Sequence, residues 1–395
     1  MPFNKTAEVV VIGGGCNGTS TALHLAKRGV KNVVLVEKKY ITSGATQDSA
    51  GNLRPYAANE ITARILQKNI DIFKNFDQII GGNCGHVQTG RIWAVAAKRK
   101  KVLETAVANC QQWGIKVKMI PLEEAQERLP QVNLEDIGAT AYFEEAGNCD
   151  PVATTNAYAA RARDLGVSIH EETEVTGIKV RSGKISAVVT SRGEIATPVV
   201  VNVAGFFSDR VGKMVGLDIP ISPQRQQNIV LRRPYDFIGI FPIFHDGINE
   251  YMFKPQRHQM DQLIGAWRTL MQPPEVVNPD SYRTDIDPEF RARSLEVVYH
   301  RFPVLKRGSY RGGATGVYDM SPDASPIFGP VPEVGGFYCH CGWSGLGFET
   351  SPLMGDLMAE LITTGKTTFL DTSLYRLSRF KEGKLHESDW FMPED

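Results

Sequence analysis

Residues 9–18 constrain the fold of this 395-residue chain more than any other stretch. An apolar run, Val-Val-Val-Ile, leads into Gly-Gly-Gly-Cys-Asn-Gly, and a helical pattern from Thr19 to Arg28 ends at Gly29. A strand, a glycine turn and a helix in this order leave unpaired backbone N–H groups at the start of the helix, where the phosphates of a nucleotide can bind. The stretch therefore predicts a dinucleotide-binding site.

Three glycines of this stretch have separate roles. Gly13 allows the tight turn, Gly15 lets the backbone approach a pyrophosphate, and Gly18 lets the helix pack against the strand, because a Cβ atom at any of them would collide. Residues 31–36 are predicted to form the second parallel strand, and Glu37 at its end can accept hydrogen bonds from both ribose hydroxyls. The alternative is a glycine-rich turn with no ligand, which the complete order of strand, glycines, helix, strand and acid disfavours.

Charge and hydropathy exclude several classes of partner. Lys plus Arg and Asp plus Glu number 44 each, so the net charge is +0, which argues against nucleic acid or an anionic membrane surface. No apolar run reaches the about eighteen residues of a membrane-spanning helix, and the N-terminal residues lead directly into the first strand. We therefore expect no signal peptide, no membrane span and a cytoplasmic location.

The six cysteines are scattered, and only Cys339-His340-Cys341 forms a cluster. Two thiols and an imidazole this close can begin a metal site, but no second cysteine or histidine pair completes it. Free thiols on a buried strand are the favoured interpretation, and we expect no metal.

The remaining periodicity predicts an α/β (α+β) protein whose two parts are each discontinuous in sequence. Its length favours two domains, or one with a large insertion. Expected helices are 59–76, 99–113, 122–129, 152–165, 287–302 and 349–363; expected strands are 90–96, 168–171, 174–181, 185–191, 198–205, 315–318 and 336–341. Shorter alternating runs at 227–231, 250–254 and 262–267 predict antiparallel strands of a separate sheet.

From these elements we assign residues 1–80, 150–218 and 310–375 to a Rossmann-like nucleotide domain. Residues 81–149 and 219–309 are assigned to a mixed antiparallel substrate-binding sheet, and 376–395 to a tail. Residues 43–55 are small and polar, which suits a loop laid along a cofactor; a surface linker is the alternative. The segment 342–348 is rich in glycine and opens the last helix, so its backbone N–H groups are a second place to meet an anion.

Four separated motifs carry a resemblance to a known family. They are residues 13–37, the Ser-Gly-Ala-Thr and Ser-Ala-Gly segments at 43–51, Ser321-Pro322-Asp323 with Pro326 and Gly329, and residues 342–348. With these, the chain resembles the D-amino-acid-oxidase superfamily of FAD enzymes, in the branch of sarcosine oxidase β-subunit, glycine oxidase and dimethylglycine dehydrogenase. The resemblance runs from Val9 to about Ile362.

The resemblance implies an FAD-dependent oxidation of the C–N bond of an amino acid or N-alkylated amine. A hydride passes to flavin N5, water hydrolyses the resulting imine, and the protein mainly positions the reactants. The substrate sheet is expected over the re face of the flavin, and homo- or hetero-oligomers are possible for this family. The cofactor-binding residues it implies are Gly13, Gly15, Cys16, Asn17, Gly18, Glu37, Lys38, Ser43, Gly44, Ala45, Thr46, Ser49, Ala50, Gly51, Val175, Ala204, Gly205, Gly342, Ser344, Gly345, Leu346, Gly347 and Phe348. Ala204-Gly205 alone also fits a simple turn.

The chain departs from relatives at several informative positions. Some relatives attach the flavin through a cysteine where this chain has Gly316, and others through a histidine where it has Asp48, so we expect noncovalent FAD. Tyr318 stands where glycine oxidase has a carboxylate-binding arginine, and Glu349 where monomeric sarcosine oxidases have a lysine. Their oxygen-activating lysine aligns with Leu263, which favours a dehydrogenase, although Lys254, Arg257 or Arg268 are alternative cations.

The candidate catalytic residues are Arg54, Tyr251, Trp267, Tyr318 and Glu349. Arg54 matches a substrate-carboxylate arginine of sarcosine oxidases; the alternative is a surface arginine paired with Glu60 or Asp48. Glu349 is expected to repel a carboxylate and to favour a substrate with a second positive group, or one without a carboxylate on that side. Its alternative role is that of a first-turn acid that favours the helix start.

Two other functions remain open at this level. One is an NAD-linked dehydrogenase, which the first motif alone permits. The other is a noncatalytic or electron-transferring flavin subunit of a larger complex, suggested by the resemblance to β-subunits.

Overall fold

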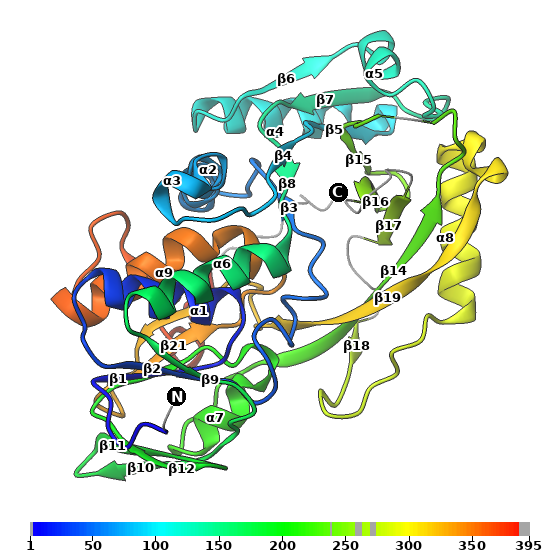
Figure 1. Cartoon of the computed structure of the whole chain (residues 1–395). Coiled ribbons are helices and arrows are strands. Elements are labelled where there is room, and N and C mark those ends of the chain that lie inside the picture. Colours follow the sequence, from blue (N-terminus) through cyan, green and yellow to red (C-terminus); the bar gives the residue numbers. More distant parts are fainter. Residues whose placement is uncertain (1–2, 238, 257–262, 269–273, 387–395) are drawn as a thin grey trace.

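The computed structural model describes residues 3–237, 239–256, 263–268 and 274–386, with the backbone alone for Gln256 and for 263–268. Two large sheets occupy opposite ends of this part of the chain (Figure 1). Long strands that leave one end and run into the other connect the two sheets, as Figure 1 shows for β14 (Ser222–Arg232) and β19 (Ser309–Met320).

The smaller of these sheets has six strands in the order β20-β21-β13-β1-β2-β9. Its core is parallel, and only β20 runs antiparallel to its neighbour. The strands are β1 (Val9–Ile12), β2 (Val33–Val36), β9 (Ser168–His170), β13 (Val200–Asn202), β20 (Ile327–Pro330) and β21 (Phe337–Cys341). Runs of valine and isoleucine suit these positions because both faces of a parallel sheet are covered.

Residues of β1 alternate between two apolar cores, one on each face of this sheet. Val9 and Val11 pack with three helices, α1 (Cys16–Lys27), α6 (Pro151–Asp164) and α9 (Gly347–Thr364). Val10 and Ile12 pack on the opposite face, which is covered by a three-stranded antiparallel sheet and by α7 (Ser208–Lys213). The covering strands are β10 (Val175–Arg181), β11 (Lys184–Thr190) and β12 (Gly193–Ala196). Figure 1 shows the three helices on one side of the sheet and these strands on the other.

The larger sheet has nine strands, and β15 and β5 form its parallel pair. Its path is β18-β14-β17-β16-β15-β5-β7-β6, with β19 paired to β14 along its length. Besides β14 and β19, the strands are β5 (Arg91–Val95), β6 (Val117–Ile120), β7 (Ala139–Phe143), β15 (Ile243–Asp246), β16 (Tyr251–Gln256), β17 (Leu263–Arg268) and β18 (Glu275–Val276).

Alternation along β5 assigns its side chains to two faces. Ile92 and Ala94 join the core formed with α5 (Leu122–Arg128) and α8 (Pro288–Arg301). Trp93 and Val95 join a second core with α2 (Glu60–Lys74) and α4 (Lys100–Gln112). A small sheet of β3 (Asn52–Leu53), β4 (Val87–Gln88) and β8 (Gly147–Asn148) lies between the two large ones; the remaining helices are α3 (Phe76–Ile79) and α10 (Arg379–Glu382).

The predicted fold class is confirmed, with differences at particular elements. The first helix begins at Cys16 rather than Thr19, and β14 and β19 are far longer than their predicted cores. The strand 309–320 belongs to the larger sheet, although 310–375 was expected in the nucleotide part. The three strands expected after α6 do not form one sheet. The first, β9, joins the six-stranded sheet, whereas β10 and β11 pair with each other in a separate sheet.

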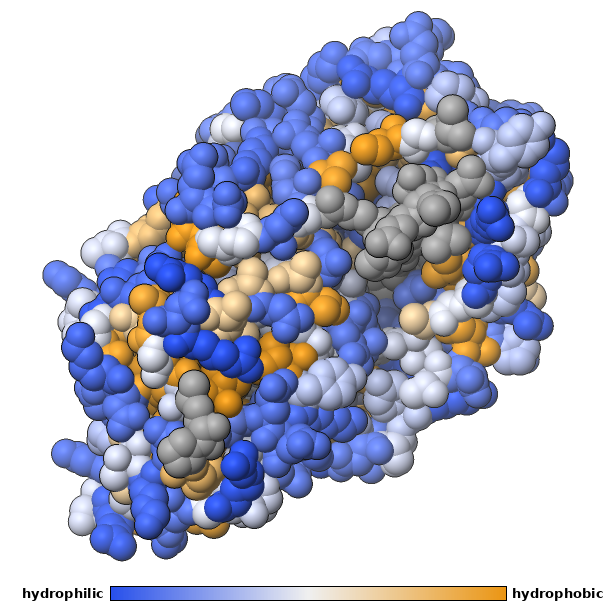
Figure 2. Space-filling view, viewed as in Figure 1, coloured by the Kyte–Doolittle hydropathy of each residue, from blue (hydrophilic) through white to orange (hydrophobic). Residues whose placement is uncertain are grey.

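The face of the molecule in Figure 2 is mostly hydrophilic, and apolar side chains gather toward the end that holds the six-stranded sheet. Within the described ranges, no helix combines the length and the apolar character that crossing a membrane requires.

Candidate active site

The glycine turn after β1 adopts the conformation that the sequence predicts. Gly13 has φ +120°, and a Cβ atom there would lie 2.3 Å from the carbonyl oxygen of Val203. A Cβ atom at Gly18 would lie 2.0 Å from the carbonyl oxygen of Gly13, so the helix can sit this close only with glycine. Gly15 precedes α1, and the Thr46 hydroxyl accepts a hydrogen bond from the Cys16 amide at 3.1 Å. Thr46 thus brings the 43–51 loop over the helix N-terminus.

Glu37 stands at the end of β2 and is already engaged by the protein. One carboxylate oxygen accepts from the Gly14 amide at 2.7 Å, and the other accepts from the Lys39 amide at 2.8 Å and the Ser43 hydroxyl at 3.1 Å. A carboxylate offers about four acceptor positions. Room is left for about one ribose hydroxyl rather than two, which corrects the sequence interpretation.

One cavity of about 560 Å³ joins this turn to the larger sheet. Most of the predicted cofactor residues line it, namely Gly13, Gly15, Cys16, Asn17, Gly18, Glu37, Lys38, Ser43, Gly44, Ala45, Thr46, Ser49, Ala50, Gly51, Val175, Ala204, Gly205, Gly345, Gly347 and Phe348. Gly342, Ser344 and Leu346 are not part of the lining. Leu346 packs in the core around α1 and α9, and the Ser344 hydroxyl accepts from the Ser321 amide at 3.1 Å.

Asp319 holds the glycine-rich segment that opens α9. Its carboxylate accepts from the amides of Gly342 at 2.8 Å and Trp343 at 3.2 Å. Burial raises the pKa of Asp319 to about 6, against these hydrogen bonds, which favour the charged form. This carboxylate was not singled out from the sequence, although its position two residues before the Ser-Pro-Asp motif was a usable signal.

The two positions at which the resemblance implied flavin attachment, Gly316 and Asp48, lie directly against each other in the cavity wall. A Cβ atom at Gly316 would lie 2.9 Å from Cβ of Asp48. Both residues line the cavity, and burial raises the pKa of Asp48 to about 6. Neither side chain is a thiol or an imidazole, so neither can form the attachments of those relatives.

Arg54 and Glu349 form an ion pair in the cavity wall. The Glu349 carboxylate accepts from Nε of Arg54 and from its backbone amide, both at 2.7 Å. The two side chains are only 11% and 5% exposed. Burial works against the charge of Arg54, but the adjacent Glu349 carboxylate more than offsets it and raises the pKa of Arg54. Glu349 is therefore balanced by Arg54, which removes the basis for expecting a second positive group on the substrate.

Three further side chains of this wall were missed in the sequence: Arg91, Tyr56 and His245. Nη1 of Arg91 donates to the Tyr56 hydroxyl at 2.5 Å, and Nη2 lies 3.2 Å from the sulfur of Met252. His245 stacks on Trp93 with ring centroids 4.6 Å apart, and burial, with Arg91 next, lowers its pKa to about 3. For Arg91, the available signal was its charge at an inward position of the apolar strand 90–96.

The structure separates the aromatic candidates. Tyr318 on β19 lines the cavity, and burial raises its pKa. Tyr251 does not line it; its hydroxyl is 2.9 Å from the Ser294 hydroxyl on α8, so its expected place at the site is wrong. Alternation along β16 instead brings Met252 to the cavity. The side chain of Trp267 lies outside the described residues, as do those of Arg257 and Arg268.

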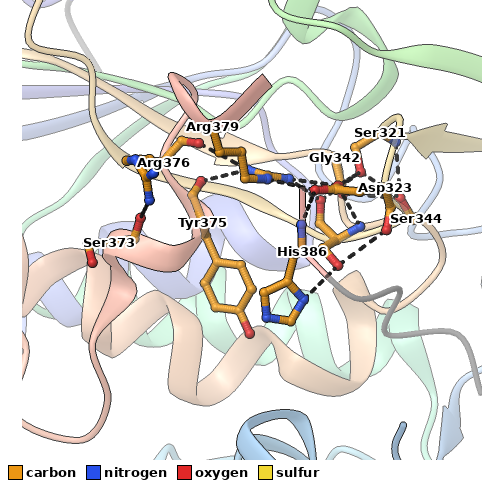
Figure 3. Close-up of polar contacts among 10 residues, drawn as sticks. Ser321, Asp323, Gly342, Ser344, Ser373, Tyr375, Arg376, Arg379 and His386 are labelled. Carbon is orange, nitrogen blue, oxygen red and sulfur yellow. Dashed lines mark hydrogen bonds and ion pairs between the residues drawn. The ribbon is translucent and has the colours of Figure 1, made fainter. Parts of the chain in front are cut away.

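The Ser-Pro-Asp motif lies outside the cavity lining and anchors the C-terminal segment (Figure 3). Arg379 donates to both oxygens of Asp323, at 2.8 and 2.9 Å, and both side chains are almost completely buried. The Asp323 carboxylate also accepts from the His386 amide at 3.1 Å. Through Ser321, whose amide donates to Ser344, this contact network reaches the segment that opens α9.

Cys339, His340 and Cys341 are buried on β21. In the described part of the chain, no group of three or more His, Cys, Asp or Glu side chains is placed to hold a metal ion. Burial lowers the pKa of His340 to about 3, so its imidazole is neutral.

The residues present fit a bound dinucleotide. The first backbone amides of α1 face the turn, and Gly13 and Gly18 leave no room for a Cβ atom. Glu37 follows β2 and lies beside them, since its carboxylate accepts from the Gly14 amide. Among the described residues, Oδ1 of Asn17 in the first turn of α1 is buried without a hydrogen-bond partner, as expected where a ligand supplies it.

The six-stranded sheet is Rossmann-like and carries this glycine turn, and one cavity extends from it to the larger mixed sheet. These features define the class of a two-part, dinucleotide-dependent protein. The family model named DAO, described as FAD dependent oxidoreductase, matches residues 8–361. The chain belongs to this family, whose members use FAD.

Relatives and solved structures agree with this membership. The chain is 28% identical to mitochondrial sarcosine dehydrogenase of Mus musculus, over 99% of this chain but 43% of the relative, so it spans less than half of that protein. It is 27% identical to sarcosine oxidase subunit beta of Rhodobacter capsulatus, over 96% of this chain and 90% of that one. The structure of L-proline dehydrogenase from P. horikoshii matches with a TM-score of 0.89 and 27% identity, covering 97% of this chain and 100% of the other.

Proposed function

We propose that this chain binds FAD noncovalently and oxidises the C–N bond of an amino acid or N-alkylated amine to an imine, which water hydrolyses. One observation carries the proposal: the cavity that begins at Gly13 and Glu37 continues without a break to Tyr318 and Glu349 on the other side. A substrate at that end would lie against the cofactor in the same cavity.

The protein's part in this reaction is to bind and orient the substrate. When bound, FAD supplies the acceptor of a hydride, and it does the redox chemistry itself. In the wall, Arg54 and Glu349 are buried and balance each other's charge. Tyr318 lines the same wall and places a hydroxyl at a fixed point of the larger sheet. Orientation of this kind supplies much of the rate enhancement in reactions that need little acid–base chemistry.

The names of the relatives support an amine or amino acid as substrate. They include a sarcosine dehydrogenase, a dimethylglycine dehydrogenase and an L-proline dehydrogenase. The alignment with sarcosine oxidase subunit beta covers 90% of that relative, which is by its name one subunit of an assembly. We therefore propose that the chain acts in a homo- or hetero-oligomer.

The test is anaerobic reduction of the purified holoprotein by a panel of amino acids and N-methylated amines. We expect at least one compound to bleach the flavin absorbance. If dithionite bleaches the flavin but no compound of the panel does, the chain is a noncatalytic or electron-transferring subunit. A colourless protein that binds NAD instead would overturn the cofactor as well.

Two tyrosine variants test whether the cavity is the site of reaction. Tyr318→Phe removes a hydroxyl from a cavity residue, whereas Tyr251→Phe removes one that contacts Ser294 on the far side of the larger sheet. We expect kcat/KM of the best substrate to fall for Tyr318→Phe alone. Equal effects of the two substitutions would contradict this location.

A further inference from the structure

Arg91 is a buried cation in the cavity wall, and no described carboxylate pairs with it. Its side chain is fully buried, and it begins β5 on the face that lines the cavity. Its terminal nitrogens contact the Tyr56 hydroxyl and the Met252 sulfur, and within the described part of the chain its Nε has no hydrogen-bond partner. A buried charge without a counter-ion is unfavourable, so such a residue usually serves a ligand.

Among the described charged residues that line this end of the cavity, Arg91 has no opposite charge paired with it. Arg54 and Glu349 cancel each other. His245 is neutral because burial lowers its pKa to about 3, and its buried Nδ1 also has no partner among the described residues. Asp246, the neighbour of His245 on β15, is paired with Arg301 at 2.9 Å outside the cavity lining. An anionic group from a ligand would supply that opposite charge.

We propose that Arg91 binds the carboxylate of the substrate, so that the substrate is an amino acid with a free carboxylate rather than a simple amine or an amide. A guanidinium has five N–H donors. The contacts with Tyr56 and Met252 use one on each terminal nitrogen, which leaves three: Nε–H and one N–H on each terminal nitrogen. Nε–H and a terminal N–H on the same side can together bind a carboxylate in a bidentate manner. Tyr56 is a positioning residue, since its hydroxyl fixes the plane of the guanidinium. The assignment rests on the proposed function, because the substrate enters the same cavity.

The assignment differs from the expectation for Arg54. Nε and the backbone amide of Arg54 both donate to the Glu349 carboxylate. The carboxylate partner of Arg54 is therefore supplied by the protein, whereas that of Arg91 is not.

Binding of a small carboxylate to the holoprotein tests the assignment without turnover. Propanoate and its uncharged analogue propanamide are titrated while the flavin absorbance spectrum is followed. We expect Arg91→Gln to weaken propanoate by about ten- to a hundredfold, the range for charged hydrogen bonds, and to leave propanamide unchanged. Arg291→Gln, an exposed arginine that lies over the Tyr310 ring, is the matched control and should bind propanoate like the unaltered protein.

The double variant Arg54→Gln/Glu349→Gln distinguishes the two arginines, because it removes a charge-balanced pair. We expect it to weaken propanoate less than Arg91→Gln does. The reverse order would assign the carboxylate to Arg54 and overturn the proposal.

A stability measurement separates a ligand site from a structural role. Arg91→Met removes a buried charge that no described group balances, so the thermal midpoint of the ligand-free holoprotein should stay or rise. A fall of the midpoint would show that Arg91 serves the fold. If Arg91→Gln loses propanoate while no amine bleaches the flavin, the carboxylate site stands and the proposed reaction fails. If substrates bleach the flavin and Arg91→Gln changes neither propanoate binding nor KM, only the assignment of Arg91 fails.

Discussion

Replacement of Glu37 by glutamine tests the nucleotide site most directly. Glu37 accepts three hydrogen bonds, from the amides of Gly14 and Lys39 and from the Ser43 hydroxyl. A glutamine oxygen can keep the Lys39 and Ser43 donors, but its NH2 group then faces the Gly14 N–H, donor against donor. The neutral amide also accepts a hydrogen bond from a ribose hydroxyl less strongly than the carboxylate does, and the loss of such a charged hydrogen bond weakens FAD binding by about 1–3 kcal/mol.

We expect Glu37→Gln to weaken FAD binding, and a comparison with FMN assigns the effect to the adenosine ribose. A loss of 1–3 kcal/mol corresponds to a dissociation constant about five- to 150-fold higher, measured by fluorescence titration of the apoprotein. Binding of FMN, which lacks the adenosine ribose, should change much less. The matched control is Glu8→Gln, because Glu8 also accepts from two backbone amides, at 3.1 and 3.0 Å, but is exposed and outside the cavity lining.

Glu8→Gln should lower the thermal midpoint without changing FAD affinity. If Glu37→Gln binds FAD as tightly as Glu8→Gln does, the carboxylate has no part in holding the nucleotide.

Three other predictions concern the C-terminal contact, the attachment of FAD and the electron acceptor. Arg379→Met leaves Asp323 buried without its counter-ion and should lower the free energy of unfolding, measured in urea, by about 3–5 kcal/mol. Arg376→Ala, which breaks the partly exposed pair with Glu382, should cost much less, and equal effects of the two variants would refute the reasoning. Burial alone would raise the pKa of Asp323, but Arg379 outweighs it and lowers that pKa, so this stabilisation is present above the ordinary pKa of an aspartate and is lost as the pH falls. FAD should separate from the polypeptide on acid precipitation, and flavin that stays in the pellet would show a covalent bond. We expect a dehydrogenase, with dye reduction faster than peroxide formation; equal rates would show an oxidase, and loss of peroxide in Lys254→Met would then assign oxygen activation to that buried lysine, which donates to the Ala50 carbonyl in the cavity wall and whose pKa is lowered to about 7 by burial.

The nucleotide-binding part of the cavity could be predicted from sequence because it depends on residues that are close together in the chain. The roles of Gly13 and Gly18 depend on sterics within one turn, and the position of Glu37 follows from strand length, so short-range pattern was sufficient. The substrate end depends on contacts distant in sequence. Arg54 meets Glu349 295 residues later, and nothing near either residue indicates that the other will neutralise it.

Face assignment in the larger sheet was the second difficulty. A one-residue shift along β16 decides whether Tyr251 or Met252 meets the cavity, and the run 250–254 carries apolar or long side chains on both faces. Arg91 was passed over because it begins an apolar strand, where a single charge is easily read as a strand boundary rather than as an inward residue.

The close approach of position 316 to Asp48 restricts how a covalent flavin link can evolve on this scaffold. Because the Cβ atoms of the two positions would be 2.9 Å apart, they compete for one small volume. A side chain can therefore be added at position 316 only if position 48 is glycine or the backbone there shifts. In this chain the Cβ atom of Asp48 occupies that volume, whereas its carboxylate lies at ordinary contact distance, so a cysteine at 316 would require a glycine at 48 or a displaced loop.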